Sequence, residues 1–271
     1  MPGSTPVFPY PGSKANLADR FIAYMPKHQT YAEPFAGTLA VLLAKPRAEF
    51  EVVNDFDEEI VNFYRVLRDH PDKLIELCEL SPWSRQEFED CRMFRHCHVT
   101  DDPIERAREF WLCRTYSING KGESFAGADG KGASAQTYLA RMTAVTDRLK
   151  NVLIENMDFS EIFDRFDSPN TVLYCDPPYL GKTRSSHIYN FDMTSVEDHD
   201  RFARYCNDAK GALFVSGYPS DEYDEMFPAP KWQYVDFEVL ATTRAHGGTK
   251  AAIERLWANI PLAEQPRLFA L

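Results

Sequence analysis

The chain has 271 residues, of which 44% are hydrophobic and 26% are charged, a balance that is ordinary for a folded protein with a sizeable core. It contains no run of about 18 uncharged apolar residues and no basic segment leading into an apolar one, so neither a membrane span nor a secretory signal is predicted. The net charge of −11 argues against a protein that coats nucleic acid in bulk.

The cysteines indicate a reducing compartment. Six of them lie scattered along the chain without a Cys-x-x-Cys pair, and we therefore expect a cytoplasmic protein. The cysteines and histidines of residues 91–98 lack the two-pair spacing of a structural zinc site, so no metal is predicted.

Residues 1–68 alternate between strand and helix patterns. Residues 30–37 (TYAEPFAG) predict a strand that runs into a turn, and residues 38–46 predict the helix behind it. Residues 50–57 (FEVVNDFD) predict a second strand with a polar end. In residues 58–71 the apolar side chains recur at helical spacing: Ile60, Val61, Tyr64 and Leu67. This alternation indicates parallel strands with crossovers, and so an α/β sheet.

Residues 69–140 have a different pattern, which is mostly helical and cannot continue a parallel sheet. We therefore predict an inserted subdomain here. Its last part, residues 118–134, is rich in glycine and lacks apolar periodicity, which predicts a mobile loop. Residues 106–150 carry a net charge of +4, against −15 for the rest of the chain. A DNA-engaging insertion and a solvated helix face beside a flexible loop both fit this contrast.

Residues 141–271 return to the α/β pattern. Strands are predicted at 152–156, 171–179 and 211–219, separated by helices. Two further strands, within 231–242 and 254–261, follow each other directly, which predicts a hairpin at the edge of the sheet.

Candidate ligand-binding residues follow two predicted strands of the first block. In open α/β sheets, ligands bind outside the carboxyl ends of the strands. Residues 33–37 (EPFAG) end the first strand, and the glycine lets the backbone approach a ligand. Asp55 ends the second strand, where an acid can accept hydrogen bonds from both hydroxyls of a ribose. Asp55 could equally be the N-cap of the helix that follows.

The most specific motif is Asp176-Pro177-Pro178-Tyr179, at the end of the strand predicted over 171–179. Two prolines fix the backbone and leave carbonyl acceptors without N–H donors. The aspartate adds another acceptor, and the tyrosine adds an aromatic face. Such a pocket suits an amino group on a planar ring.

The order of five segments resembles the D12 class of adenine-N6 DNA methyltransferases, which includes the Dam methylases. The segments are PYPGSK (9–14), AEPFAG (32–37), VVNDFD (52–57), ENMDF (155–159) and DPPY (176–179). The resemblance is weakest from about residue 84 to 140. It implies a Rossmann-like methyltransferase sheet made of residues 1–68 and 141–271, with a target-recognition insertion at 69–140. It further implies S-adenosylmethionine as cofactor, double-stranded DNA as partner, and N6 of adenine as the methylated atom.

The resemblance also implies roles for individual residues. The methionine end of the cofactor would be bordered by Tyr10, Gly12 and Lys14. The cofactor loop would be formed by Glu33, Pro34, Phe35 and Gly37. Asp55 would hold the ribose hydroxyls, and Asp158 and Phe159 would contact the cofactor's adenine. The target base would be held by Asp176, Pro177, Pro178 and Tyr179. The family's loop reads Phe-x-Gly-x-Gly, but here Leu39 stands in the last glycine place.

Residues suited to phosphate and base-edge contacts lie in the insertion and in two loops beyond it. In the insertion they are Arg114, Tyr116, Asn119 and Lys121. In the loops they are Lys182, Arg184, Thr249 and Lys250. Solvated loop charges are the alternative interpretation for each of them.

Other functions fit the sequence less well. A cytosine-N4 or RNA-adenine methyltransferase shares the chemistry, but Asp176 before the two prolines favours adenine in DNA. An inactive nucleotide- or DNA-binding module would not need an intact DPPY. An NAD-dependent oxidoreductase would carry GxGxxG after the first strand, which this sequence lacks.

Overall fold

A computed structural model of the chain describes residues 5–97, 100–127, 132–178, 193, 195–243 and 248–263. Within these ranges, the side chains of 94–97, 132–134, 240–243 and 248–250 are not described. No helix in the described ranges is long and apolar enough to cross a bilayer.

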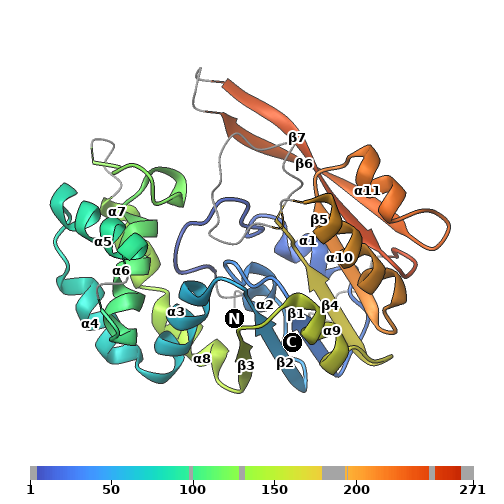
Figure 1. Ribbon diagram of the computed structural model, residues 1–271, viewed down its shortest axis with the longest axis horizontal. Helices are drawn as coiled ribbons and strands as arrows, with labels where there is room; N and C mark the ends of the chain where they lie inside the picture. Colours follow the sequence, from blue (N-terminus) through green and yellow to red (C-terminus); the bar gives the residue numbers. More distant parts are fainter. Residues whose placement is uncertain are drawn as a thin grey trace, which may run out of the picture. The chain divides into compact units, whose positions relative to one another are not determined.

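The described residues form a seven-stranded sheet, and this confirms the predicted α/β class (Figure 1). The strands are β1 (Thr30–Glu33), β2 (Phe50–Asn54), β3 (Val152–Glu155), β4 (Thr171–Cys175), β5 (Ala212–Gly217), β6 (Gln233–Thr243) and β7 (Gly248–Ala258). Their order in the sheet is β3-β2-β1-β4-β5-β7-β6. The pairs β2–β3, β1–β4 and β4–β5 are parallel, whereas β7 runs antiparallel to both β5 and β6.

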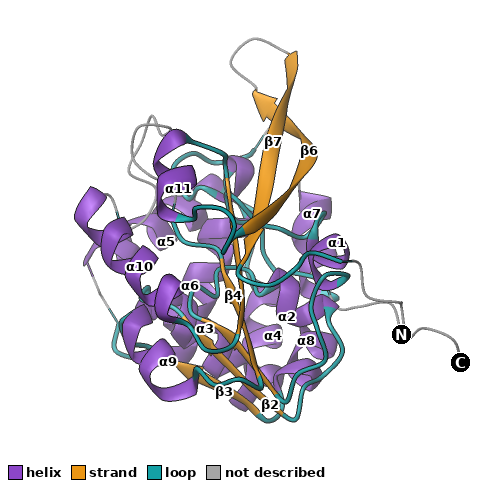
Figure 2. Cartoon of the chain, turned by 90° about the vertical axis from the view of Figure 1, so that its right-hand side faces the viewer, coloured by secondary structure: helices purple, strands orange, loops and turns teal. Residues whose placement is uncertain are grey.

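The last two strands form the predicted hairpin (Figure 2). Their pairing runs without interruption from Gln233↔Ala258 to Thr243↔Gly248. The prediction started the last strand too late, because it treated the glycines at 247 and 248 as a loop. Once the hairpin closes, each residue of β6 finds a ladder partner, and the pairing extends to Gly248.

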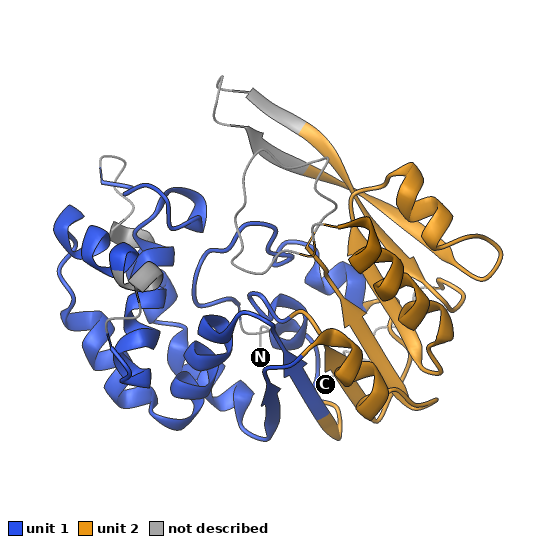
Figure 3. Ribbon diagram, in the orientation of Figure 1, with its two compact units in different colours: residues 1–22, 36–47, 51–157 blue, residues 23–35, 48–50, 158–271 orange. Residues whose placement is uncertain are grey.

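Contacts divide the chain into two compact units, coloured blue and orange in Figure 3. Unit 1 comprises residues 1–22, 36–47 and 51–157, and unit 2 comprises residues 23–35, 48–50 and 158–271. Each unit is therefore assembled from several stretches of sequence, and we describe each by itself.

Unit 1 contains β3, most of β2, and the helices up to residue 149. They are α1 (Ala18–Ile22), α2 (Ala40–Ala44), α3 (Glu58–Asp69), α4 (Pro71–Leu80), α5 (Arg85–Cys97), α6 (Pro103–Thr115), the 3-10 turn η1 (Ile118–Gly120), α7 (Gly132–Leu139) and α8 (Met142–Leu149). The four apolar residues predicted to share one face of α3 are all buried. An aromatic cluster joins α3 to α6 and to the N-terminal segment, with Phe8 packed edge-on against both Phe63 and Phe110 at 5.2 Å.

The segment 69–140 is helical wherever it is described, apart from turns and the isolated bridge between Ser117 and Phe125. It belongs to the same compact unit as residues 51–68 and 141–157. Its use as a target-recognition subdomain stays a prediction.

Residues 117–125 form a bonded turn where a mobile loop was predicted. Ser117 Oγ accepts from the Gly122 amide at 2.8 Å, and the Ile118 amide donates to the Ser124 carbonyl at 2.9 Å. Phe125 packs between Trp83 and Phe88, with ring centroids at 5.4 and 5.7 Å. The prediction looked for periodic apolar residues and therefore did not include the polar bonds and the aromatic anchor that hold the turn. Residues 128–131 of the predicted loop lie outside the described residues, and helix α7 begins at Gly132.

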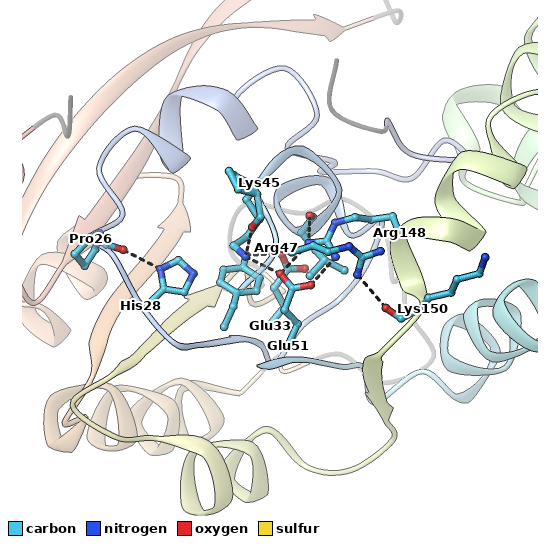
Figure 4. Close-up of polar contacts among 11 residues, drawn as sticks. Pro26, His28, Glu33, Lys45, Arg47, Glu51, Arg148 and Lys150 are labelled. Carbon is cyan, nitrogen blue, oxygen red and sulfur yellow. Dashed lines mark hydrogen bonds and ion pairs between the residues drawn. The ribbon is translucent and has the colours of Figure 1, made fainter. Parts of the chain in front are cut away.

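A buried ion network ties three parts of unit 1 together (Figure 4). Glu51 in β2 accepts from Lys45 Nζ at 2.7 Å and from Arg148 Nη2 at 2.9 Å. The three side chains are at most 9% exposed. Arg148 contributes to the net positive charge of the segment 106–150, so part of that charge lies in the core.

In its described residues, unit 2 contains β1, β4 to β7 and the helices α9 (Phe159–Phe166), α10 (Val196–Asp208) and α11 (Asp221–Met226). Strand β4 is buried at every position, as expected for a central parallel strand covered on both faces. Residues 176–178 follow at its carboxyl end.

Candidate active site

In unit 1, the Asp55 carboxylate joins the end of β2 to the turn before α2. Its Oδ2 accepts from the Gly37 amide and its Oδ1 from the Asp57 amide, both at 2.9 Å. The N-cap of α3 is Asp57, whose side chain accepts from the Glu59 amide at 3.0 Å. The alternative interpretation of Asp55 as a helix cap is therefore wrong.

Asp55 is half-buried, and its surroundings shift the pKa of its carboxyl. Burial raises the pKa of its carboxyl to about 7, although the amides of Gly37 and Asp57 act to lower it. A carboxylate in this state gains from further hydrogen-bond donors, and the two hydroxyls of a ribose are such donors.

The turn before α2 follows a glycine-like path despite the missing glycine. Gly37 has φ +45°, and Leu39, at the family's glycine place, has φ +55°. The Leu39 side chain is fully buried. The left-handed backbone is thus kept by a residue that also contributes to the core.

Two neighbours of Asp55 were missed in the sequence. Phe56 follows it directly and is 53% exposed, an unusual exposure for so large an apolar ring. Asn156 donates from Nδ2 to the Asp55 carbonyl at 2.9 Å, so the ENMDF segment fixes the end of β2. The sequence signal that could have identified Phe56 is its position directly after the acid that ends a strand.

The N-terminal motif lies against the same turn within unit 1. Ser13 Oγ and Thr38 Oγ1 share a hydrogen bond of 2.9 Å. Lys14 is 5% exposed and donates to the carbonyl of Gly12, which has φ +82°. Tyr10 is buried, with the Arg114 guanidinium 4.5 Å above its ring. Unit 1 therefore brings together the predicted residues Tyr10, Gly12, Lys14, Gly37 and Asp55.

In unit 2, Glu33 and Pro34 are buried at the end of β1, and Tyr31 Oη donates to Glu33 Oε1 at 2.5 Å. Phe35 is half-buried and packs against Phe159 at 5.8 Å. Phe35 thus meets the start of α9.

Asp158 is the N-cap of α9 and is held by α10. Its Oδ1 accepts from the Ser160 amide at 3.0 Å, and Arg201 donates to both of its oxygens, at 2.9 and 2.7 Å. Burial acts to raise the pKa of Asp158, but the hydrogen bonds from Arg201 and Ser160 bring it below the ordinary value. The Arg201 guanidinium also lies 4.5 Å from the centre of the Phe159 ring. No sequence signal near residue 201 indicated this contact.

The motif with two prolines begins directly after β4. Asp176 is half-buried, and its Oδ1 accepts from Ser216 Oγ at 3.0 Å. Pro177 is buried and Pro178 half-buried. Tyr179 lies outside the described residues, as do Lys182 and Arg184.

The candidate DNA-contacting residues of the insertion fall into two groups. Arg114 and Tyr116 are 1% and 3% exposed, and they hold the turn 117–125 and its surroundings. Arg114 Nη1 donates to the Gly120 carbonyl at 3.1 Å, and Tyr116 Oη donates to the Ser81 carbonyl at 3.1 Å. Asn119 is exposed at the apex of the turn, with φ +57°, and Lys121 is half-exposed.

Thr249 and Lys250 belong to strand β7 and not to the predicted loop. Their backbones pair with Thr242 and Ala241, and their side chains are outside the described residues.

Comparisons with known proteins show the family of the chain. A model of the D12 class N6 adenine-specific DNA methyltransferases matches residues 10–227. The chain is 29% identical to the type II methyltransferase M.MjaIII of Methanocaldococcus jannaschii, over 82% of this chain and 87% of that protein. It is 27% identical to the type II methyltransferase M1.LlaDCHI of Lactococcus lactis subsp. cremoris, over 91% of each chain. It is 25% identical to a DNA adenine methylase of Vibrio cholerae, over 66% of this chain and 67% of that protein.

The matched region begins at Tyr10 and extends beyond the motif at 176–179 and the whole of β5. It thus covers every described candidate residue for the cofactor and the target base. The chain belongs to the D12 class of N6 adenine-specific DNA methyltransferases.

Proposed function

We propose that this chain uses S-adenosylmethionine to methylate N6 of adenine in double-stranded DNA, on a base flipped out of the duplex. The observation that carries the proposal is the acceptor set at the end of β4, where Asp176 is fixed by Ser216 and is followed by two residues without N–H donors. The amino group of adenine is a donor, so this set recognises it.

The residues around Asp55 fit the ribose of the cofactor. The carboxylate stands at a strand end, and burial raises its pKa to about 7 because the charged form is poorly solvated there. Hydrogen bonds donated by the ribose hydroxyls would stabilise that charged form. The exposed ring of Phe56 beside it offers an apolar face to the adjoining purine. When bound, S-adenosylmethionine supplies an electrophilic methyl group on a sulfonium.

Asp158 and Phe159 fit the adenine of the cofactor. Asp158 Oδ1 already accepts from the amide and hydroxyl of Ser160 and from Arg201, whereas Oδ2 accepts from Arg201 at 2.7 Å. Among the described residues, Oδ2 accepts one hydrogen bond against three at Oδ1, so Oδ2 has more capacity for an amino group. Phe159 contributes by packing.

At the target base, Asp176 and the Pro177 carbonyl would accept the two N6–H hydrogen bonds. These bonds favour a pyramidal nitrogen whose lone pair is freed from the ring. The charge of Asp176 also stabilises the positive charge that develops on nitrogen. Tyr179 would stack on the ring of the flipped base. Residues that hold the base and the cofactor in defined positions would supply much of the rate.

Duplex contacts would come from the turn 117–125, through Asn119 at a base edge and Lys121 at a phosphate. Lys182, Arg184, Thr249 and Lys250 remain further candidates. Arg114 and Tyr116 would act by holding the turn.

The test is methyl transfer by Asp176→Ala and Asp176→Asn. We expect Asp176→Ala to abolish transfer while leaving cofactor affinity within about three-fold, since it removes only a contact to the target base. Asp176→Asn keeps the shape but loses the charge, so it should retain little activity. Mass spectrometry of the methylated nucleosides identifies the product. Near-normal turnover by Asp176→Ala, or N4-methylcytosine as the product, would overturn the proposal.

A further inference from the structure

Three polar side chains lie on one face of the sheet where β4 and β5 end. Tyr174 and Asp176 are two residues apart, so their side chains leave the same face. The parallel register pairs Tyr174 with Phe214 and Cys175 with Val215, and this brings Ser216 level with Asp176. Ser216 is fully buried and Tyr174 is 3% exposed.

The hydrogen bonds among the three side chains have one direction. Ser216 Oγ donates to Asp176 Oδ1 at 3.0 Å, and the same Oγ lies 2.9 Å from Tyr174 Oη. A serine hydroxyl has a single proton. Because Ser216 gives that proton to Asp176, Tyr174 must be the donor toward Ser216. The chain is polarised from Tyr174 to the carboxylate, and each bond in such a chain strengthens the next.

This chain restricts what Asp176 can do. A hydrogen bond at Oδ1 fixes the rotation of the carboxylate, and with it the directions in which the remaining lone pairs point. The hydrogen bond donated by Ser216 also makes Oδ1 an acceptor and not a donor. Both effects suit a group that must accept from an amino group in one defined orientation.

We propose that Ser216, supported by Tyr174, is a positioning residue that aims the Asp176 carboxylate at the amino group of the target base. The inference rests on the proposed role of Asp176. A purely structural role would only require that two buried hydroxyls find partners. The two roles differ in what removal of the hydroxyls does to the chemical step.

The test compares single-turnover methyl-transfer rates of Ser216→Ala, Ser216→Cys, Tyr174→Phe and the double variant Ser216→Ala/Tyr174→Phe. Ser216→Ala should slow transfer about 10-fold, as for loss of one hydrogen bond to a charged acceptor. Cysteine is a weak donor of similar size, so the transfer rate of Ser216→Cys should lie between those of the wild type and Ser216→Ala. Tyr174→Phe should slow transfer about 3-fold, and the double variant should match Ser216→Ala within about two-fold, because Tyr174 acts through Ser216. Affinities for cofactor and DNA should stay within about two-fold.

Two matched controls remove buried hydroxyls elsewhere in unit 2. Thr171→Val removes the hydroxyl that donates to the Phe166 carbonyl at 2.7 Å, at the other end of β4. Tyr223→Phe removes a hydroxyl that contacts His199 Nδ1 at 3.4 Å. Both controls should keep the wild-type rate. A Ser216→Ala rate equal to that of Thr171→Val would overturn the proposal, and so would losses by Ser216→Ala and Tyr174→Phe that multiply in the double variant.

Asp176→Ala separates this inference from the proposed function. If Asp176→Ala loses transfer and Ser216→Ala does not, only the positioning role fails. If Asp176→Ala retains turnover, the assignment of Asp176 fails as well.

Discussion

Asp55 should give cofactor binding a recognisable pH dependence. Burial raises the pKa of its carboxyl to about 7, and ribose hydroxyls prefer the ionised form. As the pH falls below about 7, the carboxyl takes up a proton, and the dissociation constant for S-adenosylmethionine should rise by up to about tenfold per pH unit. Titration calorimetry at several pH values measures this slope.

Asp55→Asn is the control for that profile. It should bind the cofactor more weakly at neutral pH, at a cost of about 2 kcal/mol for the lost charge-assisted bonds, and its affinity should not follow the same slope.

The raised pKa of Asp55 also means that the folded protein binds a proton that the unfolded chain releases between about pH 4 and about pH 7. The stabilisation from Asp55 protonation is therefore present at low pH and is lost as the pH rises through about 7. A wild-type affinity that is flat across this range would contradict the role of Asp55.

At Leu39, the cost of a left-handed backbone competes with the stabilisation from a buried side chain. Its left-handed backbone costs about 1–2 kcal/mol, which glycine would recover. Its fully buried side chain is lost on truncation, however, at a cost of about 2–5 kcal/mol. Leu39→Gly should therefore lower the free energy of unfolding by roughly 1–3 kcal/mol, as measured by urea denaturation.

Asn151 provides the comparison, because it has φ +67° and is exposed. Asn adopts the left-handed region at much lower cost than Leu, and Asn151 has no packing to lose, so Asn151→Gly should change the free energy of unfolding by less than about 0.5 kcal/mol. If Leu39→Gly stabilised the protein, backbone strain and not burial would dominate at this turn.

The turn 117–125 is the element where specificity should be tested. Asn119→Ala should alter the methylated sequence, at about 1–3 kcal/mol of discrimination for a lost base contact. Lys121→Ala should weaken binding to all DNA alike and reduce the slope of log affinity against log salt by about 0.9. Methylome sequencing and salt titrations distinguish the two effects.

Lys73→Ala, at an exposed lysine paired with Glu76 in α4, is the control for charge alone. An unchanged motif and rate in both turn variants would move the reading element elsewhere in the chain. Arg114→Ala is unsuited to this test, because the buried guanidinium holds the Gly120 carbonyl and its loss would disturb the turn itself.

The elements of the fold were predictable where periodicity or a sharp strand end marked them. The α3 face, the buried β4 and the edge hairpin all follow from side-chain patterns. The turn 117–125 was not predictable in this way, because its order comes from hydrogen bonds that involve Ser117 and Arg114, residues with no periodic signature.

The residues of the candidate site were also predictable only in part. Asp55 and Asp176 were found because each stands directly after an apolar strand. Arg201 and Ser216 were missed, since they come from other elements and reach Asp158 and Asp176 only once the chain has folded.

At the scale of the whole molecule, the network around Glu51 should be a main determinant of the stability of unit 1. Glu51→Gln would leave the buried cations of Lys45 and Arg148 without their anion. We expect the free energy of unfolding to fall by about 3–5 kcal/mol. Glu76→Gln, in an exposed pair, should cost less than about 1 kcal/mol. Urea denaturation of both variants measures the difference, and equal losses would contradict this account.

The interleaved composition of the two units has a consequence for biosynthesis and for dissection of the protein. Unit 1 is complete once residue 157 has been made, but by then the chain also carries β1, which belongs to unit 2 and pairs with β4. The nascent chain must therefore keep β1 available until Thr171–Cys175 leaves the ribosome. For the same reason, a fragment that starts at residue 158 would expose the bare edge of β4, an apolar strand with unpaired backbone groups that invites aggregation. No single cleavage separates the two units intact.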